Sequence, residues 1–268
     1  MDTLFSEKMP ALELQVFRLL SNIHGHFAIA VHDLASSQRW QYNSRPMRSA
    51  SLIKLFIMVE AFDRIRTGQL DPDSRIAFTE NERVGGAGLL QASPAGTSLT
   101  VLELIELMIT ESDNIATNLL IDRLGMDKIN VRIRSLDCQD SILRRKMMDF
   151  AAASAGQENL TSVRDVATIL AALHHGRCVD SLSDRHMCDI LERQTDRCKI
   201  PLLLPSGVVC KHKTGELPGA EHDAGIVMAS SCAYVVAIMS DNLPDSAGGC
   251  QAIAEISRTV YDVLTANQ

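Results

Sequence analysis

The sequence contains no uninterrupted apolar run that is long enough to cross a membrane. Its longest apolar stretches are broken by charged residues, Leu52–Val59 by Lys54 and Val101–Ile109 by two glutamates. The first residues also lack the basic start and following apolar segment of a secretory signal. For the sequence as given we therefore expect a cytoplasmic location, or a periplasmic or secreted one if a leader has been removed.

An excess of positive charge is missing as well. Lysine and arginine number 26 against 33 aspartates and glutamates, a formal net charge of -7. This balance disfavours nucleic acid or an anionic membrane surface as the main partner. With 46% hydrophobic and 22% charged residues, no repeats and no low-complexity tract, the 268 residues suit one large globular domain or two interleaved smaller ones.

Paired-cysteine motifs are also absent. None of the seven cysteines belongs to a C-x-x-C pair, and the equal spacing of Cys178, Cys188 and Cys198 is accompanied by no second set of ligands. An odd number of cysteines without a leader is typical of free thiols in a reducing compartment. We therefore expect core or surface thiols, and neither a metal nor another cofactor. The oligomeric state is left open.

Apolar patterns predict strands near both ends of the chain. Phe27–Val31 and Arg39–Asn43 are expected to form a β-hairpin after an amphipathic helix over Thr3–Asn22. Three more strands and a last helix are expected over residues 207–213, 225–228, 232–239 and 247–264.

The middle of the chain has helical patterns instead, over residues 51–66, 99–109, 115–124 and 163–173. These patterns predict an α/β fold of the α+β sandwich type, with one antiparallel sheet flanked by the terminal helices. Residues 1–47 and 202–268 would form this discontinuous sheet domain, and residues 48–201 an inserted all-helical domain. A ligand site is expected in the cleft between them.

The first chemical motif is Ser51-Leu52-Ile53-Lys54, at the predicted start of a helix. Residues three apart share a helix face, so the Ser51 hydroxyl and the Lys54 amine are expected within hydrogen-bond reach. A desolvated lysine can act as the base that a serine nucleophile needs. The motif alone also fits a serine cap and a solvated lysine, but the apolar neighbours of Lys54 favour burial.

Two further motifs lie downstream. Ser112-Asp113-Asn114 falls between two predicted helices, where an isolated copy would simply cap the second helix. Lys213-Thr214-Gly215 is expected at the end of a strand. There Lys213 supplies charge, Thr214 a hydroxyl, and Gly215 room for a substrate backbone, although K-T-G before a turn is unremarkable by itself.

The three motifs occur together, in this order, in class A β-lactamases and penicillin-binding proteins, and the whole chain resembles that family. The resemblance implies an active-site-serine acyl hydrolase with a β-lactamase/transpeptidase-like fold, acting on β-lactams or related amides. Ser51 would be the nucleophile and Lys54 the base for acylation, while Ser112 would carry the proton to the leaving nitrogen.

The same resemblance implies the substrate contacts. Asn114 would bind the substrate amide, and Lys213 and Thr214 with Gly215 would hold a carboxylate. The backbone N–H groups of Glu216 and Ser51 would form an oxyanion hole.

The sequence departs from the family pattern at two places, and the first concerns release of the product. The loop expected over residues 144–161 lacks the motif E-x-x-L-N, whose glutamate activates the deacylating water. Asp149 lies nearest to the expected position and Glu158 further along, but a loop carboxylate also fits a solvated or capping role. Without a placed base, a β-lactam would stay attached as a stable acyl-enzyme.

The second departure concerns the carboxylate site. The strand after K-T-G lacks the arginine of many relatives, and Glu216 adds a negative charge. A protonated His222 would compensate, or His222 and Asp223 would form a structural pair. A D,D-peptidase, esterase or amidase/glutaminase-type hydrolase, and a non-catalytic β-lactam-binding module, therefore stay open as alternatives.

Overall fold

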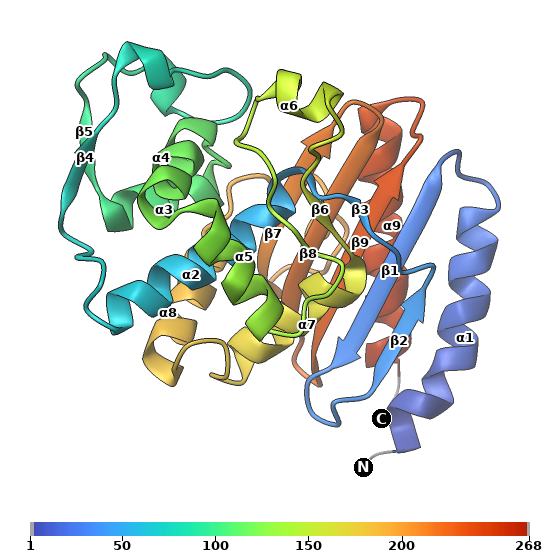
Figure 1. The fold of residues 1–268 in the computed structure, drawn as a ribbon. Coiled ribbons are helices and arrows are strands. Elements are labelled where there is room, and N and C mark those ends of the chain that lie inside the picture. Colours follow the sequence, from blue (N-terminus) through green and yellow to red (C-terminus); the bar gives the residue numbers. More distant parts are fainter. Residues whose placement is uncertain (1–2, 267–268) are drawn as a thin grey trace.

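The computed structural model describes residues 3–266 and is built on a five-stranded antiparallel sheet (Figure 1). The strand order is β2-β1-β9-β8-β7, so strands from the two ends of the chain lie side by side. Their bounds are β1 His26–Asp33, β2 Arg39–Tyr42, β7 Val209–Leu217, β8 Ala220–Met228 and β9 Ala233–Asp241. Residues 1–2 and 267–268, which the predicted sheet domain included, lie outside the described residues.

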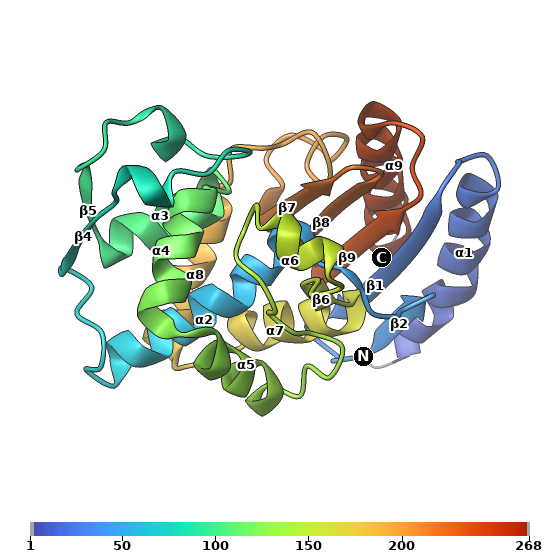
Figure 2. The ribbon, with the colours of Figure 1, turned by 45° about the horizontal axis from the view of Figure 1, so that its top comes forward.

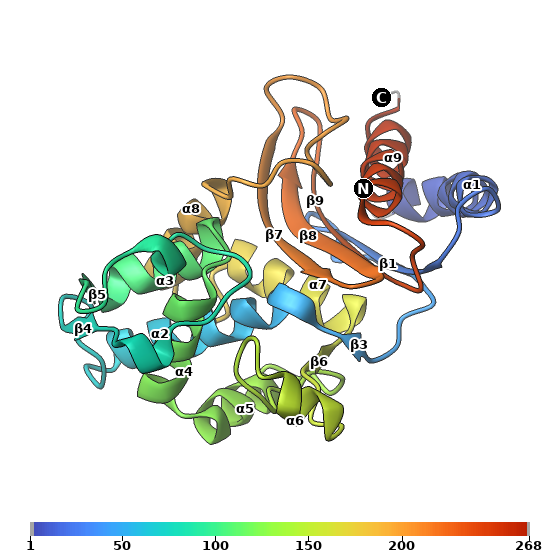
Figure 3. The ribbon, with the colours of Figure 1, turned by 90° about the horizontal axis from the view of Figure 1, so that it is seen from above.

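Alternate residues of the sheet enter two separate cores. In β1, Phe27, Ile29 and Val31 pack with the terminal helices α1 (Thr3–Leu20) and α9 (Ser246–Thr265). Ala28 and Ala30 belong to the larger core on the opposite face. Figure 3 shows α1 and α9 together on one side of the strands and the remaining helices on the other. This is the period of two that a sheet covered on both faces requires.

The inserted segment is mainly helical, and its helices gather at the opposite side of the molecule from α1 and α9 (Figure 2). They are α2 Lys54–Arg66, α3 Val101–Thr110, α4 Asn114–Leu124, α5 Met126–Ser135, α6 Phe150–Ser154, α7 Val163–His174 and α8 Ser181–Glu192. Because α7 packs directly on β1, β8 and β9, one helix of the predicted helical domain serves as the second cover of the sheet.

Short elements complete the fold. Two two-stranded sheets are formed by β3 (Met47–Arg48) with β6 (Leu160–Thr161), and by β4 (Arg75–Ala77) with β5 (Ser98–Thr100). Three 3-10 turns, named η, cover Ala50–Ile53 (η1), Glu80–Glu82 (η2) and Leu90–Ala92 (η3). No helix within residues 3–266 is long and apolar enough to cross a membrane.

The predicted fold class is confirmed, with differences in the bounds of elements. Ser51 lies in the 3-10 turn η1, and the α-helix starts at Lys54. K-T-G does not end its strand, because β7 continues to Leu217. The stretch around His222 and Asp223, expected to precede a strand, belongs to β8.

Candidate active site

A cleft of about 860 Å³ runs along the edge strand β7 and brings the three motifs together. Its lining takes residues from η1, from the α3–α4 loop, from the loop that carries α6, and from β7. The predicted site residues that line it are Ser51, Ser112, Asn114, Thr214, Gly215 and Glu216. Lys54 and Lys213 lie beneath this surface, and both are fully buried.

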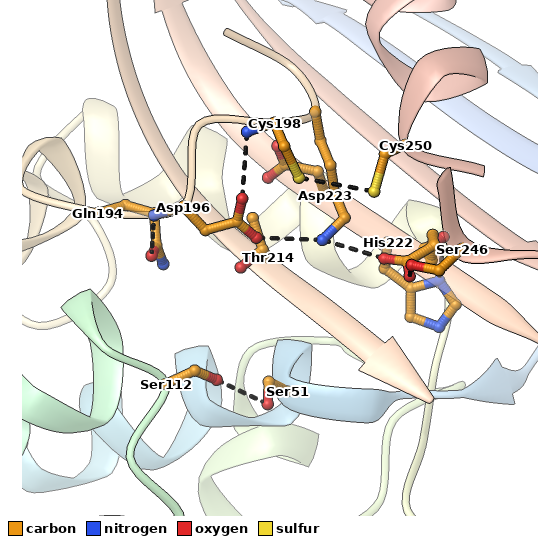
Figure 4. Close-up of polar contacts among 12 residues, drawn as sticks. Ser51, Ser112, Gln194, Asp196, Cys198, Thr214, His222, Asp223, Ser246 and Cys250 are labelled. Atoms are coloured by element: carbon orange, nitrogen blue, oxygen red, sulfur yellow. Dashed lines mark hydrogen bonds and ion pairs between the residues drawn. The ribbon is translucent and has the colours of Figure 1, made fainter. Parts of the chain in front are cut away.

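A chain of hydrogen bonds connects the two serines to Lys54. The hydroxyls of Ser112 and Ser51 are 2.8 Å apart (Figure 4). Lys54 Nζ lies 3.1 Å from Ser112 Oγ and donates to the Ser112 carbonyl oxygen at 2.6 Å. Among the described residues no hydrogen bond joins Ser51 directly to Lys54, so the expected direct contact is replaced by one through Ser112. This chain can carry a proton from the Ser51 hydroxyl to the amine.

The environment of Lys54 favours a neutral amine. Burial holds the pKa of Lys54 well below its ordinary value, because an ammonium ion loses its water there. The positive charge of Lys213 lowers this pKa further, and the carboxylate of Asp113 opposes the effect. A neutral amine can accept a proton, which a solvated lysine at neutral pH cannot do.

Three of the seven non-glycine residues with positive φ in the described part of the chain line the cleft. Ala50, directly before Ser51, has φ of +46°, and Ser112 has φ of +53°. Met148, on the opposite wall of the cleft, has φ of +64°. Left-handed conformations cost about 1–3 kcal/mol at non-glycine residues and are enriched at functional sites. Here they hold both hydroxyls in place.

Gly215 lets β7 approach the nucleophile closely. A Cβ atom added at Gly215 would lie 3.1 Å from Ala50 Cβ and 3.2 Å from the backbone nitrogen of Ser51. A larger residue would therefore push the strand and η1 apart. The glycine was expected to make room for a substrate backbone, and in the structure it also makes room for η1.

The backbone of Glu216 faces the cleft. Leu217 and Ala220 are the closing pair of the hairpin formed by β7 and β8, with two residues between them. Because hydrogen-bonding groups alternate along an antiparallel pair, the N–H of Glu216 points away from β8 and toward the free edge of β7. This N–H and that of Ser51 are the two donors that an oxyanion hole needs.

Lys213 and Thr214 occupy the middle of β7. Lys213 Nζ donates to the Thr214 carbonyl oxygen at 2.9 Å. Burial lowers the pKa of Lys213 to about 7, with Asp223 raising it and Lys199 lowering it. The ammonium charge is therefore present only in part at neutral pH.

The S-D-N motif has both structural and chemical contacts. Asp113 caps α4 by accepting from the Ala116 N–H, as the capping interpretation of this motif expects. The side chain of Asn114 is held between two partners, accepting from Lys54 Nζ at 2.9 Å and donating to the Gly85 carbonyl oxygen at 3.1 Å.

The loop opposite β7 presents apolar side chains to the cleft. Its ends are joined by a bridge between Ile142 and Leu160, which gives it the closed shape of an Ω-loop. Inside it, Met147 is fixed by Asn118, whose side chain accepts from the Met147 N–H and donates to its carbonyl oxygen. Met147 and Met148 both line the cleft, on the wall where the family pattern has its glutamate.

The two candidate carboxylates of this loop have other partners. Asp149 is exposed and caps α6 by accepting from the Ala152 N–H at 3.0 Å, and it does not line the cleft. Glu158 lines the cleft but is paired with Arg145 at 2.7 Å. Neither arrangement supports a role as the base for deacylation.

Both expectations for His222 are wrong. His222 is buried, with its Nδ1 accepting from the Ser240 N–H at 3.2 Å and its Nε2 lying 2.9 Å from the Arg48 carbonyl oxygen, and burial lowers its pKa to about 4, which disfavours a protonated ring at neutral pH. Asp223 pairs with His212 at 3.0 Å instead. The partner of Asp223 is therefore a histidine of the neighbouring strand β7, not its neighbour in sequence.

Three ionised residues in the cleft wall were missed by the motif analysis. Lys199 lies 3.1 Å from Asp196 and 3.0 Å from Glu221, and all three line the cleft. Although burial opposes the charge, the two carboxylates raise the pKa of Lys199 above its ordinary value. No sequence motif marks this contact between β8 and the segment before β7. Asn118, by contrast, could have been found, because it follows Asn114 by one helical turn.

Within residues 3–266, no three His, Cys, Asp or Glu side chains are grouped so that they could hold a metal ion.

Comparison with known proteins agrees with this geometry. Residues 11–264 match the model of the Beta-lactamase enzyme family. A β-lactamase of Bacteroides uniformis is 28% identical and aligns over 97% of this chain and 93% of its own length.

Solved structures give the same result. The β-lactamase of Sphaerobacter thermophilus DSM 20745 is 30% identical, with a TM-score of 0.88 over 96% of this chain and 98% of its own. PBP-A is 28% identical, with a TM-score of 0.87 over 94% of this chain and 95% of its own, and a mutant of it was solved as an acyl-enzyme complex with penicillin G. The chain therefore belongs to the β-lactamase enzyme family and is a serine hydrolase of the class A β-lactamase type.

Proposed function

We propose that Ser51 is acylated by a β-lactam or a related acyl compound, and that the acyl group is released slowly. The observation that carries acylation is the chain of hydrogen bonds from Ser51 through Ser112 to the buried amine of Lys54, whose pKa burial lowers. As Ser51 Oγ attacks the carbonyl carbon, its proton moves along this chain to Lys54. The carbon–nitrogen bond then breaks, and Ser112 passes the proton to the departing nitrogen.

The developing negative charge needs donors aimed at it. The N–H groups of Ser51 and Glu216 are suited to this role, because they lie where η1 and the free edge of β7 meet. Removing one such donor costs about 100-fold to 1,000-fold in rate in a well-studied serine protease. We assign the binding of the substrate carboxylate to Lys213 and Thr214, and that of the substrate amide to Asn114.

The side chains of the loop opposite β7 support slow release of the acyl group. Hydrolysis of the ester on Ser51 needs a water and a base to take its proton. The wall offers two thioethers, those of Met147 and Met148, and one carboxylate, Glu158, that is already paired with Arg145. With no free carboxylate in this loop facing the ester, we expect the acyl-enzyme to accumulate.

The charge of the cleft favours a second candidate substrate class, esters or amides that carry no carboxylate. Six acidic side chains line the cleft against two basic ones: Glu111, Glu158, Asp196, Glu216, Glu221 and Asp245 against Arg145 and Lys199. The positive charge of Lys199 is compensated by its two ion-pair partners, Asp196 and Glu221. An anionic substrate therefore depends on Lys213 alone among the lysines.

Steady-state assays test both candidates. With the native protein, nitrocefin and glutamine, which carry a carboxylate, would be compared with p-nitrophenyl acetate, which carries none, and Ser51→Ala would serve as the matched inactive variant. We expect nitrocefin to give a burst that is close to one equivalent, followed by slow turnover that Ser51→Ala abolishes. Sustained fast nitrocefin hydrolysis would contradict slow release. Identical behaviour of Ser51→Ala with every probe would favour a non-catalytic module.

A further inference from the structure

Two thiols lie in contact behind the wall of the cleft. Cys198 Sγ and Cys250 Sγ are 3.5 Å apart (Figure 4), which is the one thiol–thiol hydrogen bond within residues 3–266. Cys198 is exposed and lies between α8 and β7, whereas Cys250 is half-buried in the first turns of α9. The two residues are 52 apart in sequence and are joined here only by the fold.

We propose that Cys198 and Cys250 form a redox-modification site, which closes reversibly to a disulfide and thereby displaces the Asp196–Lys199 part of the cleft wall. Both thiols are free in the structure. A disulfide has a sulfur–sulfur distance of about 2.05 Å, so closure requires an approach of roughly 1.5 Å. The exposed Cys198 gives a soluble oxidant access to the pair.

The chemistry balances with a low-molecular-weight disulfide such as oxidised glutathione. The Cys198 thiolate attacks one sulfur of the oxidant, forming a mixed disulfide and releasing one glutathione thiolate. The Cys250 thiolate then attacks Cys198 Sγ and displaces the second glutathione. Two protein thiols are oxidised to one disulfide, and the oxidant is reduced to two thiols. Burial raises the pKa of both cysteines, so closure should be faster at higher pH.

The link to the cleft comes from the neighbours of the pair. Asp196, two residues before Cys198, and Lys199, directly after it, both line the cleft. Asp196 accepts from the Cys198 N–H at 3.1 Å. Glu221, which binds Lys199, also accepts from the hydroxyl of Ser246, the first residue of α9. Closure would draw this wall toward α9 and away from Ser51. This consequence, unlike the disulfide itself, rests on the proposed function.

The test uses the full chain, treated with a glutathione redox buffer and then with an alkylating agent. We expect the oxidised protein to lose two hydrogen atoms in intact mass, reversibly with dithiothreitol. A protease other than trypsin should give a cross-linked peptide pair, because Arg197 and Lys199 flank Cys198 and trypsin would leave a two-residue fragment. This readout needs no substrate, so it is independent of the proposed acylation.

Matched variants decide the assignment. Cys198→Ser and Cys250→Ser should each abolish the mass loss, while Cys232→Ser, a partly buried cysteine elsewhere, should retain it. Equal mass loss in all three variants, or none in the native protein, would overturn the site. Oxidation should also slow acylation by benzylpenicillin at least about threefold in the native protein and in Cys232→Ser. An unchanged rate in protein shown to be oxidised would overturn the effect on the cleft.

Discussion

Two buried amines, those of Lys54 and Lys213, have unequal roles in the site. Lys54 contacts Ser112 and Asn114, and burial holds its pKa well below the ordinary value, whereas burial lowers the pKa of Lys213 to about 7. Mutual repulsion helps to keep one of them neutral, because two ammonium ions in a dry site are unfavourable. The pair can therefore supply a base and a cation within the same cleft.

Replacing the base tests the first of these roles. Lys54→Met keeps the length and burial of the side chain but removes the amine, so we expect acylation of Ser51 to slow by about 100-fold to 10,000-fold. The measurement is the rate of adduct formation by intact-protein mass spectrometry. Lys128→Met, at an exposed position, is the control. Native acylation rates in a folded Lys54→Met protein would remove Lys54 from the mechanism.

The pKa of Lys213 predicts a dependence on pH and on substrate charge. Its ammonium is mostly present below pH 7 and lost above, so acylation by anionic benzylpenicillin should fall at least about tenfold from about pH 6 to about pH 9. A neutral ester should show no such fall, and Lys213→Arg should shift it to higher pH. Parallel profiles for both substrates would show that Lys213 does not bind the carboxylate.

At the scale of elements, strand β7 lies very close to η1 within the site. Gly215 permits it, and the strained residue Ala50 lies at the contact. The edge of the sheet and the nucleophile are thus set at a fixed distance, on which the pairing of the Ser51 and Glu216 N–H groups depends.

Gly215→Ala should disturb this distance without unfolding the chain. The new Cβ would meet Ala50 Cβ and the Ser51 nitrogen at 3.1 and 3.2 Å, so η1 must shift by a few tenths of an ångström. We expect acylation to fall at least about tenfold, because misplacement of reacting groups is costly. Thermal melting checks that the fold is retained. Full activity would show that the approach is not needed for catalysis.

The Ω-shaped loop is the element on which release depends. Asn118 anchors Met147 through both its backbone N–H and its carbonyl oxygen, so a substituted side chain at this position would keep a defined place in the wall. Met147→Glu should shorten the lifetime of the acyl-enzyme by about 100-fold, since it supplies a carboxylate base. Met147→Gln, of the same shape and without charge, should not. Equal lifetimes in the two variants would contradict the explanation of slow release.

At the scale of the molecule, the sheet and the helical segment each contribute half of the site. The meeting of the three motifs in one cleft could be predicted from the sequence because each motif has local signals and the family resemblance supplies their order. Strands β1 and β9 lie near opposite ends of the sequence and pair with each other, and no local sequence pattern alone predicts this pairing.

The parts that could not be predicted depend on contacts between distant residues. The ion pair of Lys199 with Glu221 joins a loop to β8, and Asp223 takes His212 rather than its neighbour as partner. Adjacent residues of a strand point to opposite faces, so a pair of neighbours such as His222 and Asp223 is disfavoured once that stretch is a strand. The extension of β7 beyond Lys213 was not predicted, because K-T-G was expected to lead into a turn.

Time-resolved intact-protein mass spectrometry with benzylpenicillin tests acylation and slow release together. We predict one equivalent of adduct on Ser51, located after digestion, that persists after free penicillin has been removed and that is absent from Ser51→Ala. Consumption of penicillin without a persistent adduct would contradict slow release. The absence of both adduct and consumption would contradict the proposed acylation of Ser51 by β-lactams.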